Sequence, residues 1–183
     1  PEQGKRSDVE TVREQLADGN GMRGVVRVAT NLASIKIAEA ILKYEEPRRN
    51  WKTKITWFWG PTETGKSQKA HEIFADKDFF RKTCGTAKWW DGYDAHPYVI
   101  IDDFVFPENI TDYKNWLDIF DRYGTTIQTK GGVRQFLAKE IIVTSSTSPH
   151  SSLNHFEQNG REFIRRIGQI YEFDAGGCKG TYT

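Results

Sequence analysis

The sequence has few cysteines, no long apolar run and almost no net charge. Its 183 residues include two cysteines, Cys84 and Cys178, which lie far apart and in no metal-binding spacing. They predict free thiols in a reducing compartment rather than a disulfide framework. The apolar runs are strand-sized, well below the roughly 20 residues of a membrane helix, and nothing at the start resembles a signal peptide. We therefore expect a soluble, intracellular protein with no membrane segment.

Net charge and metal-type histidines are also scarce. Lys and Arg number 26 against 25 Asp and Glu, a formal charge of +1, so any contact with DNA would need local clusters of cations. The four histidines have no cysteine or acidic partner at zinc spacing. "HPY" at 96–98 is not the paired-histidine arrangement of a DNA-nicking enzyme. We therefore predict neither a zinc site nor a DNA-nicking centre.

Hydrophobic periodicity divides the chain into two parts. Ser7 and Glu10 form a capping box, and apolar residues then recur at helical spacing as far as Tyr44. We interpret residues 1–46 as a small helical unit. "EPRRNWK" at 46–52, with a proline and three cations, is typical of a junction, so a second domain is expected over 47–183.

The second part alternates short apolar strands with amphipathic helices, which predicts an α/β fold with a largely parallel sheet. "TTIQT" and "VRQFL", joined by "KGG", predict a β-hairpin, and "GREFIRRIGQIYEF" predicts a short helix and a last strand. We expect strands at about 54–59, 98–102 and 140–144 and helices at about 66–75 and 111–122.

A phosphate-binding loop is the clearest motif. "GPTETGKS" fits G-x-x-x-x-G-K-[ST] between an expected strand and an expected helix. Backbone N–H groups would cradle the phosphates of ATP, Lys66 would neutralise the β and γ oxygens, and the Ser67 hydroxyl would ligate Mg²⁺. The predicted nucleotide-binding residues are Gly60, Pro61, Thr62, Glu63, Thr64, Gly65, Lys66 and Ser67.

Two acids end the apolar strand "YVIIDDF" at 98–104. On a sheet with a phosphate loop, the first acid holds the magnesium shell and the second can polarise an attacking water. We assign these roles to Asp102 and Asp103. A nucleoside kinase needs no second acid for water, whereas a hydrolysing motor does, so the pair favours hydrolysis.

Three further segments each allow a functional and a structural interpretation. The "TKGG" turn either brings Lys130 to a nucleic-acid phosphate backbone or is an ordinary solvated hairpin. Ser145 or Ser146, at the end of "IIVTSS", either orients water near the γ-phosphate or satisfies local backbone groups. The arginines of "REFIRRI" supply either a finger to a neighbouring subunit's nucleotide or a solvated cationic face.

The tryptophan pair in "KWWDGY", residues 88–93, predicts a packing role. Adjacent tryptophans usually place one ring in the core and leave the other covering a surface. Stacking on a nucleic-acid base is possible there and is not required.

Taken in order, "PRRNWK", "GPTETGKS", "KWWDGY", "VIIDDF", "FDRYGTTIQTKGG", "IIVTSS" and "FIRRI" resemble replication-associated proteins of circular single-stranded DNA viruses, of the circovirus-like branch. The resemblance runs from about residue 47 to the end. Residues 1–46 are similar to the family's helical oligomerisation segment but carry no sharp motif.

The resemblance implies a superfamily 3 helicase with an AAA+-like ATPase core, assembled as a hexameric ring around single-stranded DNA in a host nucleus. It places the Walker A loop at 60–67, Walker B at 99–103 and the sensor at 141–146. It places the DNA-gripping lysine at Lys130, within the turn completed by Gly131 and Gly132, and the arginine finger at Arg165 or Arg166. The family's N-terminal endonuclease domain is absent from a chain that begins at Pro1, which we interpret as part of a longer protein.

One position departs from the family pattern. The sensor strand usually ends in asparagine, and Ser146 stands there in this sequence. A serine hydroxyl reaches less far than an amide and rotates freely, so the departure bears on hydrolysis and not on nucleotide binding. The leading hypothesis is an ATP-driven DNA helicase module. The alternatives are a DNA-binding assembly module with little or no turnover and, less favoured, a small-molecule kinase.

Overall fold

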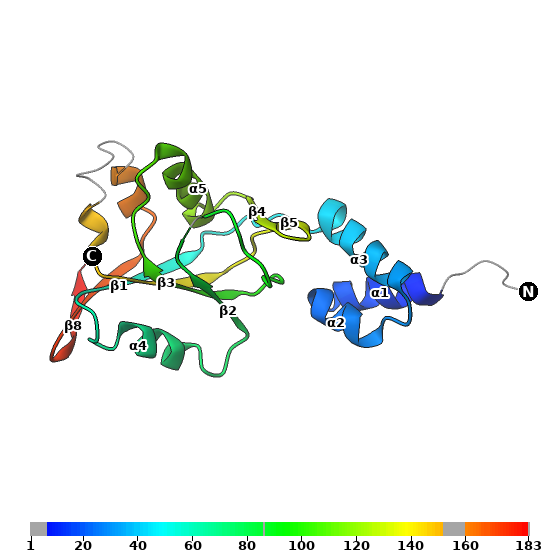
Figure 1. The fold of residues 1–183 in the computed structure, drawn as a ribbon, viewed down its shortest axis with the longest axis horizontal. Helices are drawn as coiled ribbons and strands as arrows, with labels where there is room; N and C mark the ends of the chain where they lie inside the picture. Colours follow the sequence, from blue (N-terminus) through cyan, green and yellow to red (C-terminus); the bar gives the residue numbers. More distant parts are fainter. Residues whose placement is uncertain (1–6, 86, 152–159, 183) are drawn as a thin grey trace, which may run out of the picture.

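The computed structural model describes residues 7–85, 87–151 and 160–182 (Figure 1). In its N-terminal part, helices α1 (Ser7–Ala17), α2 (Gly21–Val28) and α3 (Leu32–Glu45) form a helical segment that packs around Val12, Val25 and Ala38. The sequence periodicity runs on through 29–31, but the structure separates α2 from α3 there. The reason is a helix cap, because the Asn31 side chain accepts a hydrogen bond from the Ser34 N–H at 2.9 Å.

A sheet forms the second part. Within the described ranges it has six strands in the order β2-β3-β6-β1-β7-β8, parallel except for β8, which runs antiparallel to β7. The expected α/β fold class, a largely parallel sheet preceded by an all-α segment, is confirmed. The strands are β1 (Lys54–Trp59), β2 (Phe79–Thr83), β3 (Tyr98–Phe104), β6 (Glu140–Ser145), β7 (Gln169–Asp174) and β8 (Gly177–Tyr182).

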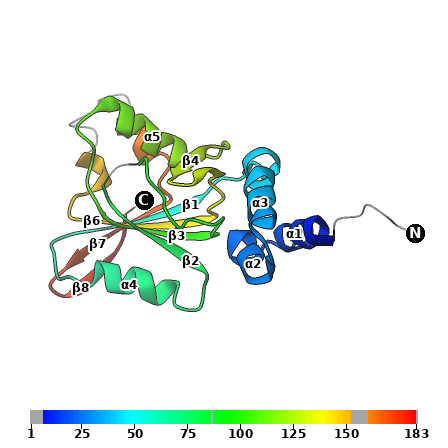
Figure 2. The same ribbon diagram turned by 45° about the vertical axis from the view of Figure 1, so that its right-hand side comes forward.

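Helices cover both faces of the sheet (Figures 1 and 2). Helix α4 (Lys66–Ile73) lies on one face, where Ala70 and Phe74 pack on Phe58, Ile100 and Ile142. Helix α5 (Ile110–Phe120) lies on the other, over a larger aromatic core that includes Trp57, Phe104, Trp116 and Phe163. The predicted hairpin is present as β4 (Thr126–Thr129) and β5 (Gly132–Gln135), a 3₁₀ turn η1 spans Pro149–Ser151, and residues 160–164 are helical.

Two strands escaped the sequence analysis. β2 has the sequence FFRKT, which lacks a clear alternation, and its pairing with β3 over Phe79–Thr83 defines it. β8 follows a turn after Asp174 and adds an antiparallel edge. Both need a partner strand distant from the local sequence signal, so hydrogen bonding and not periodicity creates them.

The junction between the two parts is more ordered than its composition suggests. Arg49, one of the three cations in "EPRRNWK", is only 2% exposed. Its guanidinium donates to the carbonyl oxygens of Asp118 at 2.6 Å, Ile119 at 2.8 Å and Tyr123 at 2.8 Å. Arg49 thereby bonds the Ile119 carbonyl, which helix geometry leaves without an intrahelical partner, and adds a second donor to the Asp118 carbonyl, which also accepts from the Asp121 N–H. Burial lowers its pKa to about 10.

Among the helices of the described ranges, none combines the length and the apolar character needed to cross a membrane.

Candidate nucleotide-binding site

The loop between β1 and α4 has the backbone shape of a phosphate cradle. Gly65 occupies the left-handed region at φ 86° and precedes the first residue of α4, so the unbonded N–H groups of the first helical turn face the loop. Gly60 has φ 144°, and a Cβ there would lie 2.0 Å from the carbonyl oxygen of Phe173 on β7. Only glycine therefore fits where the loop leaves β1.

Lys66 lies at the centre of this loop. Its ammonium donates to the carbonyl oxygens of Gly60, at 2.8 Å, and of Pro61. The side chain is largely buried, and this burial lowers the pKa of Lys66, although the carboxylates of Asp103 and Asp102 oppose the shift. The positive charge is thus held inside the loop, where phosphate oxygens would replace the carbonyl acceptors.

Asp102 faces the loop from the end of β3. Its Oδ1 accepts hydrogen bonds from the hydroxyls of Ser67 and Thr144, each at 2.7 Å, and its Oδ2 accepts from the guanidinium of Arg81, at 3.0 Å from Nε. Burial alone would raise the pKa of Asp102, but these hydrogen bonds outweigh it and hold the pKa below its ordinary value. Asp102 is therefore a buried, ionised carboxylate bound to the phosphate loop through Ser67.

The Asp103 side chain does not share the contacts of Asp102, because the strand bulges at this point. The register between β3 and β6 shifts between Ile101 and Phe104, and Asp103 has φ 56°, in the left-handed region. A bulge of this kind re-aims one side chain of a strand. The Asp103 N–H is held by the Thr144 hydroxyl at 3.0 Å, while its side chain stays exposed. One carboxylate is thus fixed on the loop and the next is free to meet solvent.

The donor set at Asp102 fits a magnesium ion. The hydroxyl of Ser67 and the carboxylate of Asp102 meet beside the phosphate loop, and oxygen ligands with room for water and phosphate are what Mg²⁺ prefers. Within the described residues, no cluster of three or more His, Cys, Asp or Glu side chains could hold a metal by itself.

The predicted hairpin presents its lysine to solvent. The Lys130 side chain is 84% exposed, and its ammonium lies 3.7 Å from Asp91 Oδ2. The Lys130 N–H donates to Asp91 Oδ1 at 2.6 Å, and the Trp90 N–H donates to the Gln128 carbonyl at 2.9 Å. The loop between β2 and β3 therefore holds the hairpin in place.

Comparison with known proteins bears directly on this arrangement. The family described as RNA helicase matches residues 56–147, just over half of the chain, from β1 through the acid pair and the hairpin to the end of β6. The chain belongs to the RNA helicase family.

Individual relatives carry the name Replication-associated protein. The chain is 34% identical to the one from Human associated cyclovirus 1, over 90% of this chain and 61% of that protein. It is also 34% identical to the one from Porcine circovirus 1, over 80% of this chain and 47% of the relative, and 31% identical to the one from Pigeon circovirus, over 92% and 52%. The resemblance predicted from the sequence is confirmed. The chain spans about half to three fifths of the length of these relatives.

Membership of the RNA helicase family implies that this chain binds a nucleotide, and the structure brings Lys66, Ser67, Asp102 and Asp103 together for it. Ser146 is exposed and lies just beyond β6. The residue that bonds both acids is Thr144, two positions earlier in "IIVTSS". Sequence analysis missed Thr144 because the bulge in β3 decides which residue of β6 faces the acids.

Arg81 is the second group that sequence analysis missed. It lies on β2, whose existence the sequence did not reveal, and its side chain reaches Asp102 while remaining 49% exposed. A basic residue following two phenylalanines carries no motif of its own. Only the tertiary structure therefore revealed its position beside Asp102.

The two candidate finger arginines of this helicase-family chain differ. Arg166 is bound within the chain, because it donates to Asp121 Oδ2 at 2.5 Å and to the Glu162 carbonyl at 2.6 Å. Arg165 is exposed. Both line a cavity of about 290 Å³ with Lys52 and Arg122. They lie before the start of β7, whereas the phosphate loop follows the end of β1, so the two sites occupy opposite ends of neighbouring parallel strands.

The two tryptophans take the predicted positions, with one ring in the core and the other at the surface. Trp90 is fully buried against Phe136 and Trp116, and Trp89 is 47% exposed. The ammonium of Lys82 holds the pair in place, because it donates to the Trp89 carbonyl at 2.6 Å and lies 4.9 Å from the Trp90 ring centre. The pair thus connects β2 with the hairpin.

Proposed function

We propose that this chain is the ATP-dependent DNA helicase module of a viral rolling-circle replication initiator. It hydrolyses ATP between the subunits of a hexameric ring and moves along single-stranded DNA. The observation that carries the proposal is the pair of adjacent acids in two environments. Asp102 is buried and bonded to Ser67, and Asp103 is exposed beside the same loop.

Each residue of the site has a distinct role in the proposed reaction. Lys66 and the first turn of α4 bind the phosphates. Ser67 and Asp102 would hold Mg²⁺, which when bound would neutralise negative charge on the phosphates. Asp103 accepts a proton from the attacking water. Its backbone is anchored by Thr144, and its carboxylate is near enough to Lys66 to oppose the lowering of the pKa of that lysine by burial. Ser146 lies beyond these groups, in the position of the family's sensor.

Three features support the movement of DNA by a ring. Lys130 is exposed on a short turn with Gly131 and Gly132, where a phosphate backbone can reach it. Arg165 or Arg166, on the side of the molecule away from its own loop, serves a neighbouring subunit. The helical segment, in the proposed domain 1–46, exposes apolar side chains suited to self-association: Val26 at 57%, Val28 at 40% and Leu32 at 65%.

The proposal includes further partners, since the chain spans only 61% of the cyclovirus relative and 47% of the Porcine circovirus 1 relative. In the proposed scheme the domain 47–183 acts beside an endonuclease domain of the same polypeptide, in the host nucleus. The helical segment joins the copies into the ring.

The test is DNA-stimulated ATP hydrolysis together with strand displacement. Lys66→Ala should abolish both. Asp103→Asn should keep nucleotide binding and lower turnover by about a hundredfold or more. Lys69→Ala, an exposed lysine on the same helix, is the matched control and should behave as the parent protein. Unchanged turnover in Asp103→Asn would overturn the role of that residue.

A second candidate is a DNA-binding assembly module that uses ATP as a structural ligand with little turnover. The exposed serine at the sensor position favours it, because Ser146 does not bond either acid within the described residues. Ser146→Asn discriminates between the two functions. A large gain in DNA-stimulated hydrolysis would show that serine limits the motor, and ring formation without hydrolysis in the parent would favour the assembly module.

A further inference from the structure

A groove lies between the helical segment and the hairpin, away from the nucleotide loop. Its volume is about 650 Å³. One wall is a face of α3 bearing Lys36, Ala40 and Lys43, which recur at helical spacing, with Tyr44 beside them. The other wall is the turn at 129–133, which includes Lys130. The groove therefore begins at the proposed DNA-contacting lysine and continues along a helix that has no assigned ligand.

Cations outnumber acids among the side chains that line the groove. Arg23, Lys36, Lys43, Lys130 and Arg134 line it, against three acids. Arg134 and Arg23 are neutralised by carboxylates, at 2.7 Å from Glu46 and 2.6 Å from Asp78. Among the described residues, neither Lys36 nor Lys43 forms an ion pair. Their charge is available to an anion.

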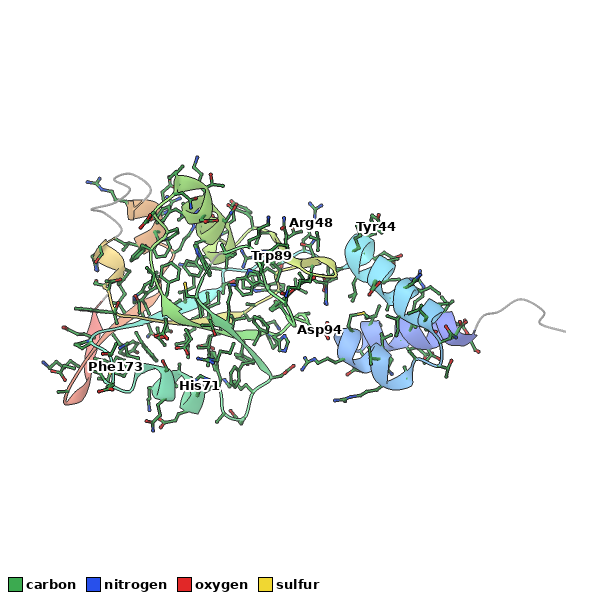
Figure 3. All side chains as sticks on the ribbon, in the orientation of Figure 1. Tyr44, Arg48, His71, Trp89, Asp94 and Phe173 are labelled. Atoms are coloured by element: carbon green, nitrogen blue, oxygen red, sulfur yellow. The ribbon has the colours of Figure 1, made fainter. Side chains whose placement is uncertain are left out.

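An aromatic ring stands next to these lysines. Tyr44 is 77% exposed at the carboxyl end of α3, and the Lys43 ammonium lies 5.1 Å from its ring centre. Figure 3 shows Tyr44 on the part of α3 nearest to the α/β body. An exposed ring beside cations is the combination that binds single-stranded nucleic acid, because bases stack on the ring while lysines meet the phosphates.

The groove is held open by contacts between its walls. Asp94 accepts hydrogen bonds from the N–H groups of Met22 and Arg23 at the start of α2, both at 3.0 Å, and from Arg134 at 2.8 Å. Figure 3 shows Asp94 between the helical segment and the sheet. Because α2, the hairpin and the loop before β3 share this carboxylate, the groove is preorganised and need not form on binding.

We propose that this groove is a second contact site for single-stranded DNA, in which Lys36 and Lys43 bind phosphates and Tyr44 stacks on a base. The inference rests on the proposed function, since the strand reaches the groove from the Lys130 turn. A duplex offers no unstacked base to Tyr44, so the site discriminates against double strands.

The first test measures binding of a fluorescein-labelled oligothymidylate by anisotropy at several salt concentrations, with the full chain and an ATP analogue. The double variant Lys36→Gln/Lys43→Gln should bind about tenfold more weakly, with a salt dependence of log K that is shallower by about 0.7 for every phosphate that is no longer neutralised. The charge-matched control is Lys69→Gln/Lys114→Gln, which changes two exposed lysines outside the groove and should bind as the parent.

Variants of Tyr44 separate the contribution of base stacking to binding from the contribution of charge. Tyr44→Ala should weaken binding about five- to tenfold with an unchanged salt slope, and Tyr44→Phe should bind as the parent because it keeps the ring. Equal binding of all variants and the parent, or equal affinity of the parent for a duplex of the same length, would overturn the groove as a single-strand site.

Lys130→Ala distinguishes this inference from the proposed function. If Lys130→Ala loses binding while the groove variants keep it, the hairpin interaction stands and the groove site is wrong. If the groove variants lose binding while Lys130→Ala keeps it, the groove site stands and the hairpin interaction fails.

A groove variant that disturbs ring assembly would be detected by light scattering. In that case crosslinking tests the groove on the unaltered protein. Oligothymidylate carrying iodouracil is irradiated on the unaltered chain, and mass spectrometry locates the attached peptide. Attachment at Tyr44 supports the groove. Attachment confined to other peptides overturns it.

Discussion

Charged groups at the two ends of the parallel strands are held in different ways. Where β1 and β3 end, Lys66, Ser67 and Asp102 come from compact motifs, and each contacts the loop that would hold phosphate. Before β1 and β3 begin, Glu46 and Asp94 meet Arg134 of the hairpin. We call these three residues the ionic cluster.

The ionic cluster is more deeply buried than its polar composition suggests. The side chains of Glu46, Asp94 and Arg134 are 3%, 6% and 11% exposed. Burial would lower the pKa of Arg134, but the two carboxylates raise it above its ordinary value. The candidate nucleotide site has polar groups that a ligand could bind. In the ionic cluster the charged side chains pair with one another and connect three parts of the chain. Its role is to position the hairpin against the helical segment.

The largest effect on stability is expected from Arg134→Ala. It leaves the carboxylate of Glu46 buried without its cation and removes one of the two arginines beside Asp94, so the free energy of unfolding should fall by about 3–5 kcal/mol. Urea unfolding measures this decrease. Arg48→Ala removes an exposed arginine of the junction, labelled in Figure 3, and should change stability by less than about 0.5 kcal/mol. Equal decreases in the two variants would show that the cluster does not hold the two parts together.

Thr144→Val tests the other end of the strands. The change removes the hydroxyl that bonds Asp102 and the Asp103 N–H, which should cost about 1–3 kcal/mol of unfolding free energy. ATP turnover should fall by about ten- to a hundredfold, because both acids lose a common anchor. Ser146→Ala is the control, with little effect on stability. A greater loss of turnover in Ser146→Ala than in Thr144→Val would restore Ser146 as the principal polar group.

Arg81→Gln should have a smaller effect. The ion pair with Asp102 is half exposed on the arginine side, so about 1 kcal/mol of stability is expected from it after screening by solvent. The depressed pKa of Asp102 stabilises the fold above about pH 4, and this contribution is lost as pH falls through the folded-state pKa. Unfolding measured against pH should therefore show a smaller acid-dependent loss in Arg81→Gln. An unchanged acid dependence would contradict a role of Arg81 in holding Asp102 ionised.

The smallest effect is expected from the titration of His96, next to the ionic cluster. Its Nδ1 accepts from the Asp94 N–H at 3.0 Å, and burial lowers its pKa, with Arg23 and Arg134 adding to the shift and Asp78 and Asp94 opposing it. Neutral His96 therefore stabilises the fold fully above about pH 6.5, and this contribution is lost as pH falls.

Thermal unfolding of the parent and of His96→Gln as a function of pH measures that contribution. The stability advantage of the parent should shrink below about pH 6.5. A constant difference between the two proteins down to pH values well below this would show that His96 does not titrate on folding.

The sequence predicted the elements whose signals are local. The limits of β1 and the starts of α4 and β3 agree with the sequence analysis because a short apolar run, a glycine-bounded turn and a helical period each lie within a few residues. The placement of Lys66, Ser67 and Asp102 at one edge also follows from local pattern, since parallel strands bring their carboxyl ends together. The division into domains and the roles of Lys130, Arg165 and Arg166 stay predictions.

Tertiary structure alone decided the rest. Strand β2 and its Arg81 exist through pairing with β3, and the bulge at Asp103 determines that Thr144 rather than Ser146 contacts the acids. The ionic cluster joins residues 46, 94 and 134, and no periodicity relates positions so far apart. The sequence by itself predicted a phosphate-binding loop after β1, because that chemistry needs only neighbouring backbone groups. Which side chains support the acids, and how the hairpin meets the helical segment, depend on contacts that form only when distant segments pack.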